Sequence, residues 1–106
     1  MKRIILSTFL LFVLLFPNEK TAFLIPIQGD IDMGLPYFIE RSIDLAKEEK
    51  PNFVLFNIDT FGGRVDAATK IKDSILGCPI PTIAFINRRA ISAGALISLS
   101  CDSIYM

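Results

Sequence analysis

The chain has no histidine and no tryptophan, and only two cysteines among its 106 residues. Without histidine it lacks the commonest general base of enzyme catalysis, and two cysteines alone make a zinc site improbable. No sign of charge dominates either, because 11 lysines and arginines balance 11 aspartates and glutamates. A nucleic-acid surface needs a basic face, so the composition argues against that class, and we expect no metal and no cofactor.

Apolar residues are plentiful instead, at 52% of the chain, which is enough for a packed core in one small domain. The first 22 residues stand apart from that domain. Lys2 and Arg3 precede an apolar run from Ile4 to Phe16, which Pro17 ends. This order is typical of a secretory signal peptide, and a retained membrane anchor is the alternative. In either case we expect an exported, membrane-associated protein on the extracytoplasmic face.

Export would permit a disulfide between Cys78 and Cys101. Two cysteines allow a single pairing, but nothing in the sequence brings the two side chains together. Cys78 lies in a predicted helix-to-strand connection and Cys101 near the end of an apolar helix. We favour two buried or half-buried free thiols.

After residue 22 the hydrophobic pattern alternates between short apolar runs and amphipathic stretches, which predicts an α/β fold with a mostly parallel sheet. Pro26 favours an edge position for the first strand. The second run is apolar almost throughout, as in a strand covered on both faces. We expect strands at 23–27, 53–58, 81–86 and 103–106, and helices at about 35–50, 65–76 and 92–100.

In the first helix we expect a buried stripe that includes Phe38, and in the second a stripe that begins at Val65 and ends before Gly77. The third helix is apolar almost all round, so we expect it to be enclosed. The stretches 59–63 and 87–91 are predicted loops that leave the carboxyl ends of neighbouring strands. Since these ends share one edge of a parallel sheet, the two loops can face each other.

Ser92 begins the last helix, in the stretch NRRAISAGALISLS. A serine there is commonly an N-cap, although Ala95 holds the place where a capping box would have glutamate or glutamine. The alternative is a nucleophile, because the helix N-terminus offers positive partial charge and Ala93 and Gly94 leave room for a substrate carbonyl. The N–H of Ala93 would then be a natural oxyanion donor.

Gly62 and Gly63 lie between a strand and a helix, in NIDTFGGRVDAATKI. They could simply form a tight turn with positive φ. Neither a nucleotide phosphate loop nor a dinucleotide fingerprint fits, because the further glycine, lysine and hydroxyl residues are missing. Paired with Ser92 across the sheet edge, they predict a two-loop oxyanion hole. We expect Arg88 and Arg89 to be solvated loop residues at this edge.

The blocks IPIQGDID, NIDTFGGRVDAATKIKDSI and PTIAFINRRAISAGALISLSCDSIYM, in this order, resemble the NfeD-type membrane-bound serine proteases of the Clp-protease and signal-peptide-peptidase-A class. The resemblance covers residues 23–106. It implies a truncated Clp-protease/crotonase-like spiral of ββα units, the N-terminal part of a serine protease domain. It also implies a Ser–Lys dyad in which Ser92 is the nucleophile, Gly63 and Ala93 form the oxyanion hole, and Phe61 and Gly62 belong to the substrate loop.

Two positions depart from the family pattern. Phe61 stands where the family usually has proline before the glycine pair, and the family's lysine base lies several dozen residues beyond the nucleophile, past Met106. We therefore expect the 106-residue chain alone to be inactive or nearly so. The resemblance further implies a hydrophobic peptide or membrane-protein substrate, such as a stomatin-like partner, and a homo-oligomer in the full-length family. The alternatives are a crotonase-like acyl-CoA enzyme and a non-catalytic, membrane-associated interaction or scaffold fragment.

Overall fold

The computed structural model describes residues 19–106, so the expected signal or anchor lies almost wholly outside the described residues. Within them strands and helices alternate, and the four strands form one parallel sheet in the order β1-β2-β3-β4. The elements are β1 (Ala22–Gln28), α2 (Leu35–Glu49), β2 (Phe53–Thr60), α3 (Val65–Leu76), β3 (Thr82–Ala90), α4 (Ala93–Leu99) and β4 (Ser103–Tyr105). The predicted α/β fold and the edge position of β1 are confirmed.

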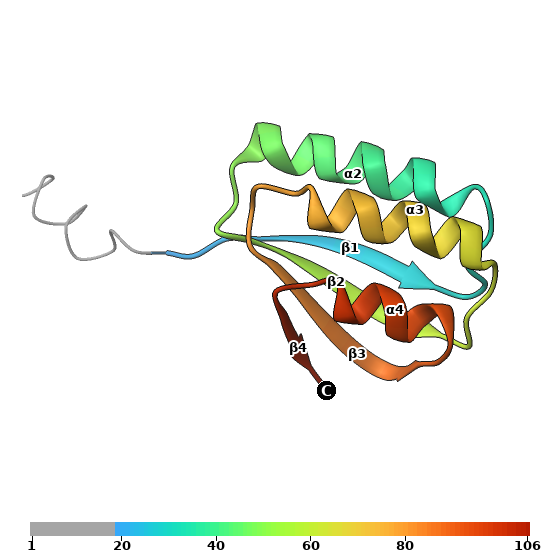
Figure 1. Cartoon of the computed structure of the whole chain (residues 1–106). Helices are drawn as coiled ribbons and strands as arrows, with labels where there is room; N and C mark the ends of the chain where they lie inside the picture. Colours follow the sequence, from blue (N-terminus) through green and yellow to red (C-terminus); the bar gives the residue numbers. More distant parts are fainter. Residues whose placement is uncertain (1–18) are drawn as a thin grey trace, which may run out of the picture.

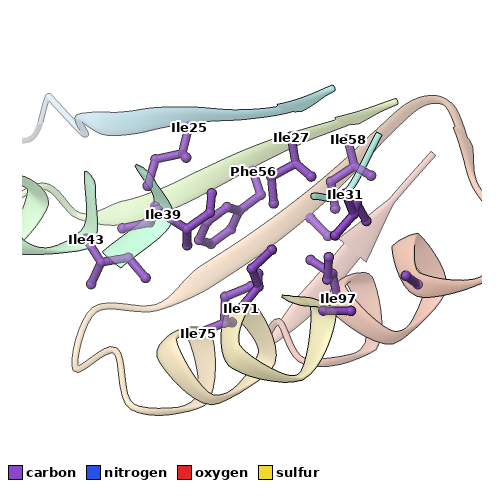
Figure 2. Packing of buried hydrophobic residues seen from close by; sticks show 14 of the residues in the cluster. Ile25, Ile27, Ile31, Ile39, Ile43, Phe56, Ile58, Ile71, Ile75 and Ile97 are labelled. Atoms are coloured by element: carbon purple, nitrogen blue, oxygen red, sulfur yellow. The ribbon is translucent and has the colours of Figure 1, made fainter. Parts of the chain in front are cut away.

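The three helices cover the same face of the sheet (Figure 1). In sequential order with right-handed crossovers, each helix returns over that face. The core lies between the two layers, where isoleucines from the helices meet Ile25, Ile27, Phe56 and Ile58 from the strands (Figure 2). The buried apolar residues are Ile25, Ile27, Ile31, Ile39, Ile43, Ala46, Val54, Phe56, Ile58, Ala67, Ala68, Ile71, Ile75, Ala84, Ala93 and Ile97.

The opposite face of the sheet is more open than the sequence suggests. In β2 buried and half-buried residues alternate, so the expectation that this strand is covered on both faces is wrong within residues 19–106. Leu24, Leu55 and Ile83 form one cross-strand row on this face, and Leu24 is exposed. The run of apolar residues in β2 therefore has one set of side chains buried in the core and the other set half-buried on this second face.

Helices α2 and α3 begin and end close to where the sequence predicts. The Asp32 carboxylate accepts hydrogen bonds from the backbone N–H groups of Gly34 and Leu35, at 3.0 and 3.1 Å, and so caps the start of α2. The stripes are partly wrong, because Phe38 and Val65 are exposed. The buried residues of α3 are Ala67, Ala68, Ile71 and Ile75, which share one side of the helix. Val65, two residues before Ala67, lies about 160° away from it around the helix axis.

The end of β3 is the main difference from the sequence prediction. Residues 87–90, expected to be a loop, extend the strand, because Thr60 pairs with Ala90 after a register shift at Ile58/Thr60.

Helix α4 is not enclosed within the described residues, since Leu99 is 73% exposed. Only one side of α4 meets α3 and the sheet. Cys78 and Cys101 are half-buried free thiols, as predicted.

Candidate active site

The loop after β2 and the turn after β3 meet at the carboxyl ends of the strands. A Cβ atom added to Gly62 would lie 3.0 Å from the Cβ of Ser92, 3.0 Å from the carbonyl oxygen of Ile91 and 3.4 Å from the backbone nitrogen of Ala93. Gly62 also has a φ of 113°, which side-chain-bearing residues rarely adopt. Glycine is therefore required there both for its backbone conformation and for the close approach of Ser92. The predicted meeting of the two loops is confirmed.

Ser92 has a strained backbone, with φ 56° and ψ −115°. Among the described residues, only it and Lys50 combine a side chain with positive φ, and Lys50 does so at the left-handed end of α2. Such a conformation costs of order 1–3 kcal/mol, and strain of this kind concentrates at functional sites. Ser92 occupies the N-cap position of α4, as the sequence suggests, but its hydroxyl makes no capping hydrogen bond. The residue is exposed to solvent.

Two backbone N–H groups, one directly after Gly62 and one directly after Ser92, lack an acceptor in the part of the chain that the structure describes. Within residues 19–106, neither Gly63 nor Ala93 donates a hydrogen bond, whereas Gly94 donates to the carbonyl of Ile91 at 3.0 Å. Ala93 is the first residue of α4, where unpaired N–H groups carry the positive end of the helix dipole. These N–H groups are therefore free to donate hydrogen bonds to an anionic oxygen of a ligand. A serine on a strained strand-to-helix turn, followed by such an amide, is a known design for acyl transfer.

Gly63 is held in place by a parallel bridge to Ile31, the residue that follows the β1 turn. The N–H of Ile31 donates to the carbonyl of Gly62 at 3.0 Å, and the N–H of Arg64 donates to the carbonyl of Ile31 at 2.8 Å. A Cβ on Gly63 would lie 2.7 Å from the nitrogen of Ile31, far inside contact distance. Both hydrogen bonds of the bridge are made by the neighbours of Gly63, so they hold its backbone in place without using its own N–H.

Thr60 is the residue of this region that sequence reasoning missed. Its buried hydroxyl donates to the carbonyl of Gly29 at 2.6 Å and accepts from the N–H of Gly62 at 3.0 Å. Its own carbonyl accepts from the N–H of Ile91 at 3.1 Å. Three loops therefore meet on one threonine. The only signal in the sequence was a hydroxyl two residues before a glycine, a common turn pattern.

Gly94 contributes differently from the expectation. It is buried, and a Cβ there would lie 2.5 Å from the Cγ2 methyl of Thr60. Its missing side chain thus makes room for Thr60, which corrects the idea that Gly94 keeps space for a substrate carbonyl.

Arg89 also departs from expectation. It is half-buried beside Asp59 and Phe61, whereas Arg88 is exposed as predicted.

Comparisons with known proteins identify the family of the chain. The family described as NfeD1b, N-terminal domain, matches residues 21–106. The chain belongs to this family. It is 38% identical over 89 residues to "Membrane protein NfeD1b" of Bacillus subtilis, and 31% identical over 111 residues to "Membrane-bound protease PH1510" of Pyrococcus horikoshii. These alignments cover 84% and 100% of the chain but only 20% and 25% of the two relatives. The chain thus spans a quarter or less of their length.

Solved structures place the NfeD1b-family fold among Clp-like proteases. The 1510-N membrane protease specific for a stomatin homolog from Pyrococcus horikoshii superposes with a TM-score of 0.74 at 28% identity, over 82% of this chain and 45% of that one. ClpP1 from Listeria monocytogenes gives 0.68 at 25% identity, over 74% and 46%. The expected resemblance to the NfeD-type, Clp-protease-like fold is confirmed, and relatives of the chain are proteases and membrane proteins by name.

Other features of this NfeD1b-family domain lie away from the glycine–serine edge. A groove of about 390 Å³ at the start of β1, lined by residues that include Phe23 and Leu45, contains none of the expected site residues. In the described part of the chain, no cluster of three or more His, Cys, Asp or Glu side chains could hold a metal ion. No helix within residues 19–106 has the length and apolar character needed to span a bilayer.

Proposed function

We propose that residues 23–106 form the N-terminal part of a serine endopeptidase domain of the Clp-protease-like class. The observation that carries the proposal is the contact between two loops distant in sequence. The contact is between Gly62 and Ser92, and the residues that follow them, Gly63 and Ala93, have backbone N–H groups with no acceptor within the described residues. A nucleophile and a pair of oxyanion donors are the minimal parts of such a site.

In the proposed reaction the Ser92 hydroxyl attacks the carbonyl carbon of a peptide bond, and a base takes the hydroxyl proton. The carbonyl oxygen becomes an anion, which the N–H groups of Gly63 and Ala93 stabilise. The C–N bond then breaks, the amine leaves with the proton, and an ester to Ser92 remains. Water hydrolyses this ester through a second oxyanion at the same place, and Ser92 regains its proton.

Among the described residues, we identify no side chain that could act as the base. Lys47 is paired with Asp44 and Lys72 with Asp73, on the outer surfaces of α2 and α3. A neutral lysine base needs burial to lower its pKa. We propose that a lysine of the complete protein, several dozen residues beyond Ser92 as the family resemblance implies, takes this role. The 106-residue chain alone is then expected to hydrolyse no peptide at a measurable rate.

The proposal extends to the setting of the domain. We propose that residues 1–22 are a signal peptide or membrane anchor and that the domain works on the extracytoplasmic face. One relative is a protease specific for a stomatin homolog, by its name. A hydrophobic, stomatin-like membrane-protein segment is therefore our candidate substrate. We further propose that the complete protein is a homo-oligomer, as the resemblance implies.

Site-mapped labelling with a fluorophosphonate tests the proposal on the complete protein, which would contain the proposed base. The reagent phosphonylates a serine whose attack is assisted by an oxyanion hole, because its P=O oxygen accepts hydrogen bonds from the same N–H groups. We expect modification of Ser92 and none of Ser103, which is also exposed and lies on β4. Ser92→Ala should abolish the labelling. Labelling of both serines at the same slow rate would refute an oxyanion hole at Ser92.

Hydrolysis of an unstructured peptide by the 106-residue chain, lost in Ser92→Ala, would refute the proposed external base. A third outcome is labelling of neither serine in the complete protein while partner binding survives Ser92→Ala. It would favour the scaffold alternative. An acyl-CoA thioester competing with the phosphonate would favour the crotonase-like one.

A further inference from the structure

Phe61 lies between Thr60, the last residue of β2, and the glycine pair. Unlike proline, phenylalanine leaves φ free to vary. Its ring is also 68% exposed, so burial in the core does not anchor it. On the inner side of the loop, the Thr60 hydroxyl accepts the N–H of Gly62, and Ile31 forms a backbone bridge to Gly63. Within residues 19–106 no backbone hydrogen bond holds Phe61 itself, so the outer side of the loop depends on side-chain contacts.

Arg89 supplies a contact at this place. Its guanidinium carbon lies 4.3 Å from the centre of the Phe61 ring, well within the range of a cation–π interaction. Its Nε atom lies 3.7 Å from a carboxylate oxygen of Asp59. Arg89 belongs to β3, whereas Asp59 and Phe61 flank the end of β2. The guanidinium thus joins the loop to the neighbouring strand.

Backbone contacts hold the two strand ends that carry Asp59 and Arg89. On β2, the carbonyl of Asp59 accepts the N–H of Gly29 at 3.1 Å. On β3, Ala90, the residue after Arg89, pairs with Thr60. Asp59 and Arg89 are each only about one-third exposed, at 28% and 35%. A planar guanidinium can stack on a ring and meet a carboxylate at once, which a lysine ammonium does less well.

We propose that Arg89 is a positioning residue that holds Phe61, and through it the amides of Gly62 and Gly63, opposite Ser92. The Phe61–Arg89 stack replaces the restraint that a proline ring would give at position 61. That this ordering serves acyl transfer rests on the proposed function. The ordering itself does not, so the two can fail separately.

Amide ¹⁵N relaxation of Gly63 in the full chain measures the ordering directly. In the native chain we expect a backbone order parameter near 0.85, typical of rigid structure. In Arg89→Ala we expect a lower value, between about 0.6 and 0.85, because the Thr60 and Ile31 contacts remain. Arg88→Ala is the matched control, because it removes the same charge from the adjacent, exposed position. It should leave Gly63 rigid. Arg89→Lys, which keeps the charge and shortens the stack, should give an intermediate value.

Phe61→Pro provides a rescue. Thr60 is extended, as a residue before proline must be, and the Phe61 N–H donates no hydrogen bond within residues 19–106. In the Phe61→Pro background, Arg89→Ala should leave the Gly63 order parameter unchanged. The proposal is overturned if Arg89→Ala leaves Gly63 rigid, if Arg88→Ala loosens it equally, or if the proline background does not rescue.

Fluorophosphonate labelling of Ser92 on the same variants separates this proposal from the proposed function. We expect labelling to slow at least tenfold in Arg89→Ala and to recover in the double variant with Phe61→Pro. Loss of order in Arg89→Ala, with no labelling of any variant, would leave the positioning role standing and remove the protease proposal. Labelling of all variants at the native rate, with Gly63 equally rigid in each, would overturn the role of Arg89.

Discussion

Thr60 offers the sharpest test of how the three loops are held together. Thr60→Val keeps the size of the side chain and the methyl group beside Gly94, but it removes the hydroxyl. The buried N–H of Gly62 would then lose its 3.0 Å acceptor, while the carbonyl of Gly29, in an exposed turn, can turn to water. One buried unsatisfied group costs about 1–3 kcal/mol, so we expect a loss of about 2 kcal/mol in the free energy of unfolding.

Thr60→Ser is the matched control. It keeps the hydroxyl and its two hydrogen bonds and removes only the methyl, which costs about 1 kcal/mol by lost burial. The free energies of unfolding would come from urea titrations followed by circular dichroism. Because these two losses differ by only about 1 kcal/mol, amide hydrogen exchange at Gly62 provides the more decisive comparison.

In Thr60→Val the Gly62 amide should exchange about 5–30 times faster than in the native chain, the factor that corresponds to 1–2 kcal/mol. In Thr60→Ser the protection should be nearly native. Equal exchange of Gly62 in the two variants would refute the idea that the hydroxyl, and not the shape of Thr60, holds this loop.

Two further predictions concern stability. Gly63→Ala places a Cβ against the Ile31 backbone, which cannot move aside as a flexible side chain can, and should cost about 3 kcal/mol by overpacking. Gly29→Ala meets no atom within 4 Å and should cost only its left-handed strain, about 1 kcal/mol. Urea titrations giving equal losses would contradict the close approach. Burial raises the pKa of the Cys101 thiol from 9.0 to about 12. The unfolded chain therefore loses this proton first, and stability should fall as pH rises from about 9 toward 12. Cys101→Ser should flatten that fall. If the free energy of unfolding depended on pH in the same way in both proteins, the pKa of Cys101 would not be raised in the folded chain.

Much of the site follows from local sequence. The apolar runs beginning at Phe53 and Pro81 predict two parallel strands, and parallel strands direct their following loops to one edge. That reasoning places Gly62 and Ser92 on the same side of the molecule. It fails at the outer surfaces, where Val65 and Leu99 are exposed against expectation. Hydrophobic periodicity reports which residues could be buried, and the neighbouring elements decide which of them are.

The alternation of strands and helices, the parallel sheet and the meeting of two glycine- and serine-bearing turns could be predicted from the amino-acid sequence. These features depend on side-chain pattern and on chain connectivity, both of which are local. The strained backbone of Ser92, the convergence of three loops on Thr60 and the stacking of Arg89 on Phe61 could not be predicted in this way. Each of these depends on the register between strands about 30 residues apart, and a shift of one residue would turn the side chains to the other face.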